Sequence, residues 1–410
     1  MMKTLVLGGY GNFGARICRI LGRDPRIELW IAGRDGPRAE ALAVSIRNHG
    51  VRGVAIDLDS ADLVVELRRL GIELVIHAAG PFQQQGYGVA EAAAAAGAHY
   101  IDLADGRRFV CDFPAAVDAA FRAAGRTAVC GASTLPGLSS AVVEHLAAGW
   151  REIDSIDICI APAQTAPRGR ATLAAVLSYC GEPVSVWIEG AWQTRRGWAA
   201  PEPIEFARLK ARMGALCDVP DLELFPTRYG VTQRVMFNAA LESGMAQRAF
   251  ERLSKLRARR LLPRLTHFTG LLNATAGLLD FLGTPRGGMM LRVQGRNAAG
   301  RPMRRSWHIV AEDDHGPEIP CMAALLLARR LASPDARGPL PVGAHIAAGL
   351  LTLMEFAPEF ARWGMATDTL NETVGTPAWR VACRPSGIAR RSHPGRRGHP
   401  ATHGPRPGTT

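Results

Sequence analysis

A glycine-rich turn near the start of the chain carries the first residues with spacing suited to chemistry. The pattern G-x-G-x-x-G is formed by Gly9, Tyr10, Gly11, Asn12, Phe13 and Gly14. In such a turn the first glycine permits a tight bend, the second lets the backbone approach a pyrophosphate, and the third lets a helix pack on a strand. Free N–H groups at the start of that helix would then meet the anion. We therefore predict that these six residues bind a dinucleotide.

The residues after the second expected strand bear on which dinucleotide binds. They read Ala32-Gly33-Arg34-Asp35. NAD-binding proteins usually place a carboxylate here for the ribose hydroxyls, whereas the planar guanidinium of Arg34 suits the 2′-phosphate of NADP. NADP is therefore the predicted cofactor, and Asp35 keeps NAD as the less favoured alternative. Asp57, near the end of the third strand, is a candidate to border the adenine, or else caps the following turn.

Small residues follow the fourth expected strand. Ala79, Gly80 and Pro81 leave room for the ribose and nicotinamide of a cofactor, because ligands bind at the carboxyl ends of parallel strands. A plain Gly-Pro turn is the alternative. On the next strand, Tyr100 and Asp102 are candidate catalytic proton donors, since hydride transfer often needs one. For both residues a structural role, as a buried hydroxyl and a loop-capping carboxylate, is the favoured interpretation.

These residues lie in an alternating series of strands and helices. Strands are expected at 4–7, 27–32, 51–58, 74–78, 100–103 and 127–130. Helices are expected at 12–21, 37–49, 60–70, 89–96 and 115–124. Such alternation with short connections predicts a parallel sheet covered by helices on both faces. Residues 1–135 are therefore predicted to form a doubly wound α/β domain, the Rossmann NAD(P)-binding architecture.

The pattern changes after Pro136. Strand-like runs at 153–160, 184–192, 289–294 and 307–311, with a hairpin connection at 295–300, predict an α+β domain built on an antiparallel sheet. This second domain, residues 136–316, is expected to bind substrate or to mediate dimerisation. Helices at 319–331 and 350–360, within residues 317–367, are expected to return to the first domain. The segment 376–410 lacks apolar periodicity and is expected to be a disordered basic tail.

Composition and charge limit the partners. The net charge is +12, but seven arginines and no acidic residue follow Thr376, so the charge is concentrated in the tail and does not predict a nucleic-acid partner. The eight cysteines show neither C-x-x-C pairs nor zinc spacing, so no metal site is predicted. Buried free thiols, no signal-peptide core and no spanning apolar segment lead us to expect a cytoplasmic protein.

Two further features leave alternatives open. The basic stretch 246–260 and the apolar stretch 261–282 suit peripheral membrane contact, although packing on their own domain is favoured. The arginines of the predicted hairpin could bind substrate carboxylates or face water, and the second interpretation is favoured. They are Arg292, Arg296, Arg304 and Arg305. A homodimer also stays open.

Taken together, four motifs in order resemble the saccharopine dehydrogenase-like family of NADP-binding oxidoreductases. They are VLGGYGNFGARICRIL, IAGRD, VIHAAGPFQQQGYGVAEAAAAAGAHYIDLADG and GASTLPGLSSAVVEHLA, with weaker likeness up to about Thr367. The resemblance implies a cofactor on residues 9–14, Arg34 and residues 79–81, with Tyr100 and Asp102 near the nicotinamide. The chain departs from the family at Ala104-Asp105-Gly106, where a Gly-Glu pair is often found.

The resulting expectation is an NADP-dependent oxidoreductase that moves hydride to or from an imine or carbonyl of a small metabolite. One alternative is a reductase of a lipid-linked enoyl substrate at a membrane surface. The other is a regulatory protein that binds NADP without catalysis.

Overall fold

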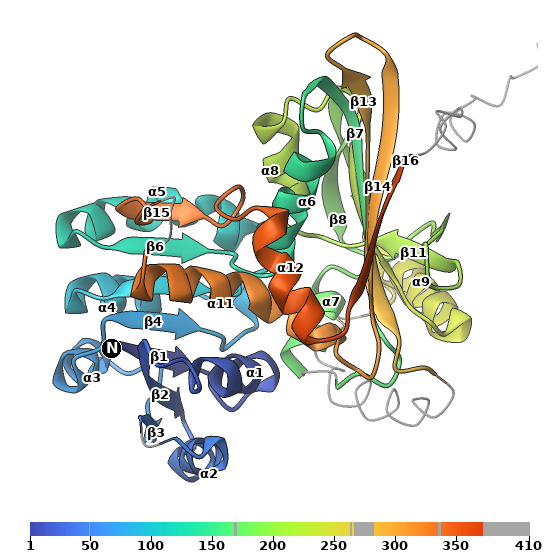
Figure 1. Cartoon of the computed structure of the whole chain (residues 1–410). Helices are drawn as coiled ribbons and strands as arrows, with labels where there is room; N and C mark the ends of the chain where they lie inside the picture. The colour runs from blue at the N-terminus through green and yellow to red at the C-terminus, as the bar shows by residue number, and fades with distance from the viewer. Residues whose placement is uncertain (49, 168–169, 263–264, 266–282, 335–337, 372–410) are drawn as a thin grey trace, which may run out of the picture. The chain divides into compact units, whose positions relative to one another are not determined.

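The computed structural model describes residues 1–371 apart from 49, 168–169, 263–264, 266–282 and 335–337 (Figure 1). The predicted basic tail and most of the apolar stretch 261–282 lie outside the described residues. No helix in the described part of the chain is both long and apolar enough to cross a membrane. The described residues also contain no group of three metal-ligating side chains arranged to hold a metal ion.

The first sheet has seven strands in the order β15-β6-β5-β4-β1-β2-β3, and all neighbours are parallel. Its strands are β1 (Met2–Leu7), β2 (Ile27–Gly33), β3 (Val51–Ala55), β4 (Leu74–His77), β5 (His99–Asp102), β6 (Thr127–Cys130) and β15 (Gly343–Ile346). Its helices are α1 (Asn12–Leu21), α2 (Gly36–Ile46), α3 (Leu63–Leu70), α4 (Gly88–Ala96), α5 (Arg107–Ala124) and α11 (Ile319–Ala332).

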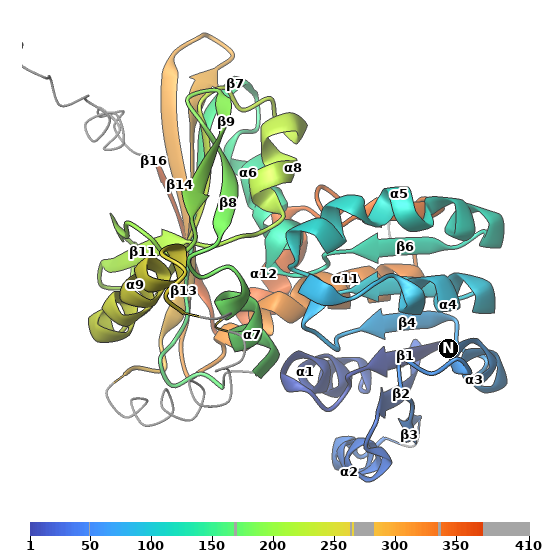
Figure 2. The same cartoon turned by 180° about the vertical axis from the view of Figure 1, so that it is seen from behind.

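The strands are buried on both sides, and their alternate residues enter different cores. On β1, Val6 packs with residues of α1, α2 and α11, whereas Leu5 and Leu7 pack with residues of α3, α4 and α5. Accordingly, α11 crosses in front of the strands in Figure 1, and α4 and α5 cross in front of them in Figure 2. The predicted doubly wound α/β fold is confirmed.

Several boundaries differ from the sequence-based prediction. The third strand ends at Ala55 rather than at 58, and the next helix begins after Asp62 rather than after Ser60. Helix α5 begins at Arg107 rather than at 115 and continues through Pro114. Strand β15 was not predicted, because its four residues show no alternation and pair only with β6, far away in the sequence.

The second sheet has nine strands, with the path β10-β11-β12-β7-β13-β14-β16 and a side branch of β8 and β9. Its strands are β7 (Trp150–Ala161), β8 (Pro183–Ile188), β9 (Ala191–Arg196), β10 (Glu202–Ile204), β11 (Arg212–Leu216), β12 (Arg234–Ala240), β13 (Gly287–Asn297), β14 (Pro302–Ala311) and β16 (Ala366–Asn371). The remaining α-helices are α6 (Ser139–Leu146), α7 (Arg170–Ser178), α8 (Asp221–Arg228), α9 (Gly244–Ala258) and α12 (Leu353–Arg362). Short helical turns span η1 (Phe82–Gln84), η2 (Thr134–Leu138) and η5 (Gly316–Glu318).

The predicted α+β second domain is confirmed, with two corrections. The sheet is mixed rather than antiparallel throughout, because β12 pairs with β7 in parallel. The single strand expected at 184–192 is a hairpin of β8 and β9, which turns at Glu189 and Gly190, both at positive φ. The turn was missed because Glu189 is not a typical residue for the left-handed region, so only one glycine marked it.

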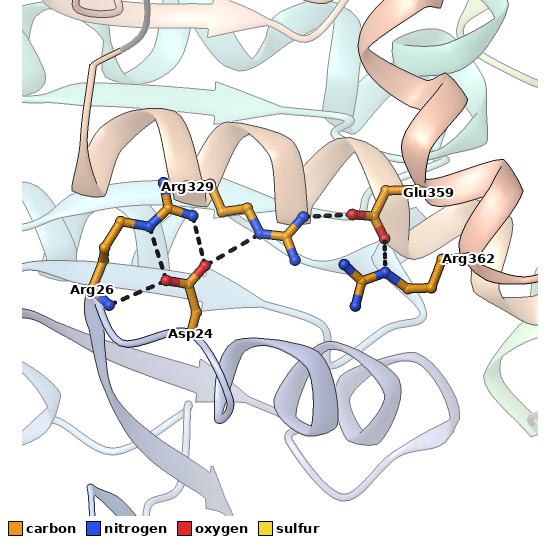
Figure 3. A network of polar contacts seen from close by, with 5 residues as sticks. All are labelled: Asp24, Arg26, Arg329, Glu359 and Arg362. Atoms are coloured by element: carbon orange, nitrogen blue, oxygen red, sulfur yellow. Dashed lines mark hydrogen bonds and ion pairs between the residues drawn. The ribbon is translucent and has the colours of Figure 1, made fainter.

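The C-terminal segment joins both sheets. Helix α11 packs on α1, and β15 extends the parallel sheet at β6. Strand β16 then pairs with β14 of the second sheet. An ionic network ties this segment to the loop before β2. Its members, shown in Figure 3, are Asp24, Arg26, Arg329, Glu359 and Arg362.

Candidate functional site

The glycine turn between β1 and α1 is closely packed. The N–H of Gly9 donates to Ala32 O at 3.0 Å, and the N–H of Gly11 donates to Gly8 O at 2.9 Å. A Cβ added to Gly14 would lie 2.2 Å from Gly8 O, so only glycine lets α1 approach the turn this closely. Helix α1 begins after Gly11 without a side-chain cap and without an acidic residue in its first turn. Its first N–H groups and positive dipole end therefore suit an anion such as a pyrophosphate.

The predicted loop after β4 lies against the glycine turn. β1 and β4 are neighbours where the strand order reverses, and the N–H of Ala78 donates to Leu7 O at 2.9 Å. A Cβ on Gly8 would lie 2.9 Å from Ala79, and Gly80-Pro81 is a cis peptide. Gln85 Nε2 donates to Ala79 O at 2.8 Å and to Pro81 O at 3.0 Å. The structure thus brings two predicted cofactor segments together at the position where doubly wound sheets bind ligands.

At the end of β2 the two charged residues differ. Arg34 is exposed, and no ion pair or hydrogen bond of its side chain occurs among the described residues. Asp35 caps α2, because its Oδ1 accepts from the N–H of Arg38 at 3.1 Å. The carboxylate that kept NAD as an alternative therefore has a helix-capping role, while Arg34 is available to an anion.

Asp57 has a similar turn-stabilising contact. Its Oδ1 accepts from the N–H of Asp59 at 3.2 Å, and its side chain is exposed. These contacts support the turn-capping alternative. A role beside the adenine stays a prediction.

Tyr100 and Asp102 lie inside the first domain. Asp102 Oδ1 accepts from the N–H groups of Ala104 at 3.0 Å and Gly131 at 2.8 Å, which ties β5 to the loop after β6. Burial raises the pKa of Asp102 to about 6. Tyr100 Oη lies 3.1 Å from His77 Nδ1, its ring stacks on Phe113, and burial raises its pKa well above the usual value. Both side chains are shielded from solvent and hold the sheet together, and their catalytic role stays a prediction.

Asp105, which was not among the site residues predicted from the sequence, lies beside the loop after β4. Gln83 Nε2 donates to its Oδ1 at 3.1 Å. The side chain is exposed to solvent, yet desolvation by the surrounding protein raises its pKa. Its position, three residues after Asp102 on an expected loop, was the available signal.

Residues that follow β5 and β6 contact side chains and backbone of residues 185–221. Arg107, at the start of α5, pairs with Asp218 at 2.6 Å and donates from Nη1 to Ser185 O at 2.9 Å. Ser139 Oγ donates to Asp221 Oδ1, and burial raises the pKa of Asp221 to about 7. No sequence pattern could have revealed these pairs, since their partners are 78 to 111 residues apart.

Two of the hairpin arginines have partners within the fold. Arg296 Nε lies 3.8 Å from Glu152 Oε2. Arg305 donates to Leu146 O at 3.0 Å and to Asn371 Oδ1 at 3.2 Å. Arg296 is exposed, as the favoured interpretation expects, whereas Arg305 is half-buried. A substrate role for the hairpin arginines stays a prediction.

Comparison with known proteins finds a match for the first domain. Residues 4–129 match the family model of the saccharopine dehydrogenase NADP binding domain. The first domain of this chain is thus similar to the NADP-binding domain of that family. The match covers the glycine turn, Arg34, the loop after β4 and β5, and it confirms the predicted family, the cofactor NADP and the oxidoreductase class. A comparison with curated protein sequences finds no relative.

Solved structures extend the likeness beyond the NADP-binding domain. The apo histidine-tagged saccharopine dehydrogenase (L-Glu forming) from Saccharomyces cerevisiae is 13% identical, with a TM-score of 0.64, and the match covers 91% of this chain and 100% of that one. The shared fold therefore includes both sheets. An amine dehydrogenase from Mycobacterium smegmatis is 10% identical, with a TM-score of 0.45, and the match covers 86% of this chain and 96% of that one. An engineered D-amino acid dehydrogenase bound to NADP+ is 13% identical, with a TM-score of 0.42, and the match covers 87% of this chain and 98% of that one. Both TM-scores are too low to infer a shared overall fold.

Proposed function

We propose that this NADP-dependent oxidoreductase transfers hydride to or from an imine or carbonyl carbon of a small metabolite. The observation that supports this most is the accessible carboxyl of Asp105, held by Gln83 beside the cofactor loop after β4. In a doubly wound sheet the nicotinamide half of the cofactor lies toward these strand ends. A carboxyl there is suited to exchange a proton with the substrate heteroatom.

The chain's own residues have three tasks in this reaction. The cofactor, when bound, supplies or accepts the hydride. The glycine turn and Arg34 bind its phosphates, and the loop of Ala79, Gly80 and Pro81 borders its nicotinamide half. The Asp105 carboxyl, whose pKa is raised by desolvation, exchanges a proton with the heteroatom of the substrate.

A pair of variants tests Asp105 against Asp102. Asp105→Asn should lower kcat by about 100-fold or more, because general acid catalysis commonly contributes that much, while leaving the affinity for NADPH unchanged. Asp102→Asn keeps the acceptor for Gly131 and Ala104 and should retain most of the activity. Steady-state kinetics and NADPH titration measure both. If Asp102→Asn abolishes turnover in a folded protein and Asp105→Asn does not, the proton donor is Asp102.

The whole proposal is tested by titrating purified protein with NADPH and NADH and then assaying the occupied protein against imines, keto acids and enoyl thioesters. We expect tighter NADPH binding and turnover of an imine or a keto acid. Turnover of enoyl thioesters alone would favour the lipid-linked alternative, whose apolar stretch lies mostly outside the described residues. Tight binding without turnover of any class would favour the regulatory alternative.

A further inference from the structure

Tyr10, the residue between the first two glycines of the turn, extends to the end of β2. Its ring lies against Gly33, where a Cβ would be 2.5 Å from Tyr10 Cε1. Its hydroxyl accepts a hydrogen bond from the N–H of Asp35 at 2.9 Å. The side chain is thus held by contacts at both its ring and its hydroxyl. Tyr10 forms a fixed surface at the point where a cofactor's adenosine ribose would lie.

Arg38 packs on that surface. Its guanidinium carbon lies 4.7 Å from the centroid of the Tyr10 ring, within the range of a cation–π contact. Arg38 is the third residue of α2, where the helix dipole disfavours a positive charge. The nearby Asp35 carboxylate accepts from the Arg38 backbone N–H, and no ion pair of the Arg38 side chain occurs within the described part of the chain. The charge of Arg38 is therefore available to a bound anion.

Arg34 adds a second guanidinium just before the same helix. Both arginines are exposed, and both flank the short segment of Asp35, Gly36 and Pro37 that begins α2. Neither side chain has an ion pair among the described residues, and a dianion bound between them would offset the positive charge at this end of the helix. A ribose hydroxyl in the same place would not. This arrangement favours a ligand that carries a phosphate here.

We propose that Tyr10 is a positioning residue that holds Arg38 in place, so that Arg38 and Arg34 bind the 2′-phosphate of NADP together. This inference deepens the NADP-dependent function proposed above and rests on it. Selectivity for NADP over NAD then comes from three residues rather than from Arg34 alone, and Asp35 contributes by capping α2 instead of binding the ribose.

The test measures binding rather than turnover. Dissociation constants for NADPH, NADH and adenosine 2′,5′-bisphosphate are determined by calorimetry for wild type, Arg38→Gln, Tyr10→Leu, Tyr10→Phe and the double variant Tyr10→Leu/Arg38→Gln. Arg52→Gln is the matched control, because Arg52 stacks on Trp30 at 5.1 Å in the same sheet but away from the glycine turn. Thermal melting of each variant verifies folding.

Arg38→Gln should weaken the binding of NADPH and of the bisphosphate by about tenfold or more, as expected for the loss of a charge-assisted contact. It should weaken the binding of NADH by less than about twofold. Tyr10→Leu should weaken NADPH binding by a similar factor, and the double variant should bind NADPH no more weakly than Arg38→Gln alone. Tyr10→Phe should retain NADPH binding because the ring remains. Arg52→Gln should match wild type.

Other results overturn the inference. If wild type prefers NADPH but Arg38→Gln weakens both cofactors equally or neither, Arg38 does not bind the 2′-phosphate. If the losses for Tyr10→Leu and Arg38→Gln add fully in the double variant, Tyr10 does not act through Arg38. If wild type shows no preference for NADPH, the NADP-dependent function itself fails with it.

Discussion

At the scale of single residues, several carboxyl groups have pKa values set by their surroundings rather than by their neighbours in sequence. Asp221 is fully buried, and Ser139 donates a hydrogen bond to it. Burial raises its pKa from 3.8 to about 7. Desolvation also raises the pKa values of Asp105 and Asp218, although the charge of Arg107 opposes the shift at Asp218. Carboxyl groups of this kind occur at functional sites more often than elsewhere.

Asp221 gives a prediction about stability and pH. Because its pKa is higher in the folded state, the folded protein holds a proton that the unfolded chain has lost between about pH 4 and pH 7, so stability falls as the pH rises through that window. Asp221→Asn removes the ionisable group and keeps an acceptor for Ser139. It should be more stable than wild type above pH 7, on the order of 2 kcal/mol, with little difference near pH 4. Urea unfolding across this range measures it, and a difference independent of pH would contradict the explanation.

At the scale of elements, the cofactor segments are positioned by close contacts of backbone with backbone. The turn after β1 needs glycine because α1 approaches Gly8 and because Gly8 itself approaches Ala79. Strand β6 and helix α6 are joined by η2, whose residues pack against α11. These contacts fix the ends of the parallel strands relative to each other, so a cofactor would meet a preformed surface.

The glycine turn gives the second prediction. In Gly14→Ala the new methyl group would lie 2.2 Å from Gly8 O, so α1 must shift away from the turn. We expect NADPH affinity to fall by about tenfold or more, since the first N–H groups of α1 would move from the pyrophosphate. Gly88→Ala is the control, because no atom lies within 4 Å of a Cβ there. Equal NADPH affinities for the two variants would contradict the assigned role of the turn.

At the scale of the whole described molecule, the ionic network of Figure 3 joins three segments far apart in sequence. Arg329 contacts Asp24 Oδ2 at 3.3 Å and Glu359 Oε1 at 2.6 Å, and both carboxylates are buried. The hydrogen bond from Arg26 is the main cause that lowers the pKa of Asp24 to about 2. The loop before β2, helix α11 and helix α12 are thereby held together.

Removal of Arg329 tests that network. Arg329→Met leaves two buried carboxylates without this partner and should destabilise the protein by about 3 kcal/mol, as broken buried pairs commonly do. In the wild type, the contribution of Asp24 to the free energy of unfolding should be complete above about pH 4. It should be lost as the pH falls toward 2, because the pKa of Asp24 is depressed in the folded state. Arg69→Met, which removes an exposed pair with Glu66, is the control and should have little effect in chemical unfolding. Similar losses in both variants would contradict the importance of the network.

The sequence was sufficient for features that repeat locally. The alternation of apolar runs predicted the parallel sheet, and the spacing of Gly9, Gly11 and Gly14 predicted the turn at its centre. Strand β15 and the first eight residues of α5, 107–114, were missed because they are stabilised by tertiary contacts rather than marked by a local pattern. The pairing of Arg38 with Tyr10 and the exposure of Asp105 could not be predicted, since both depend on how the ends of separate strands meet. The domain boundaries at 135, 316 and 367 stay predictions.

The central claim is that this chain carries out hydride transfer with NADP. The most direct measurement mixes wild-type protein with NADPH deuterated at C4 of the nicotinamide and a panel of imines and keto acids, and then locates deuterium in the products by mass spectrometry. We predict deuterium at the former imine or carbonyl carbon of one class of product, with NADPH preferred over NADH. NADPH that stays bound with no deuterium transferred to any member of the panel would contradict the claim.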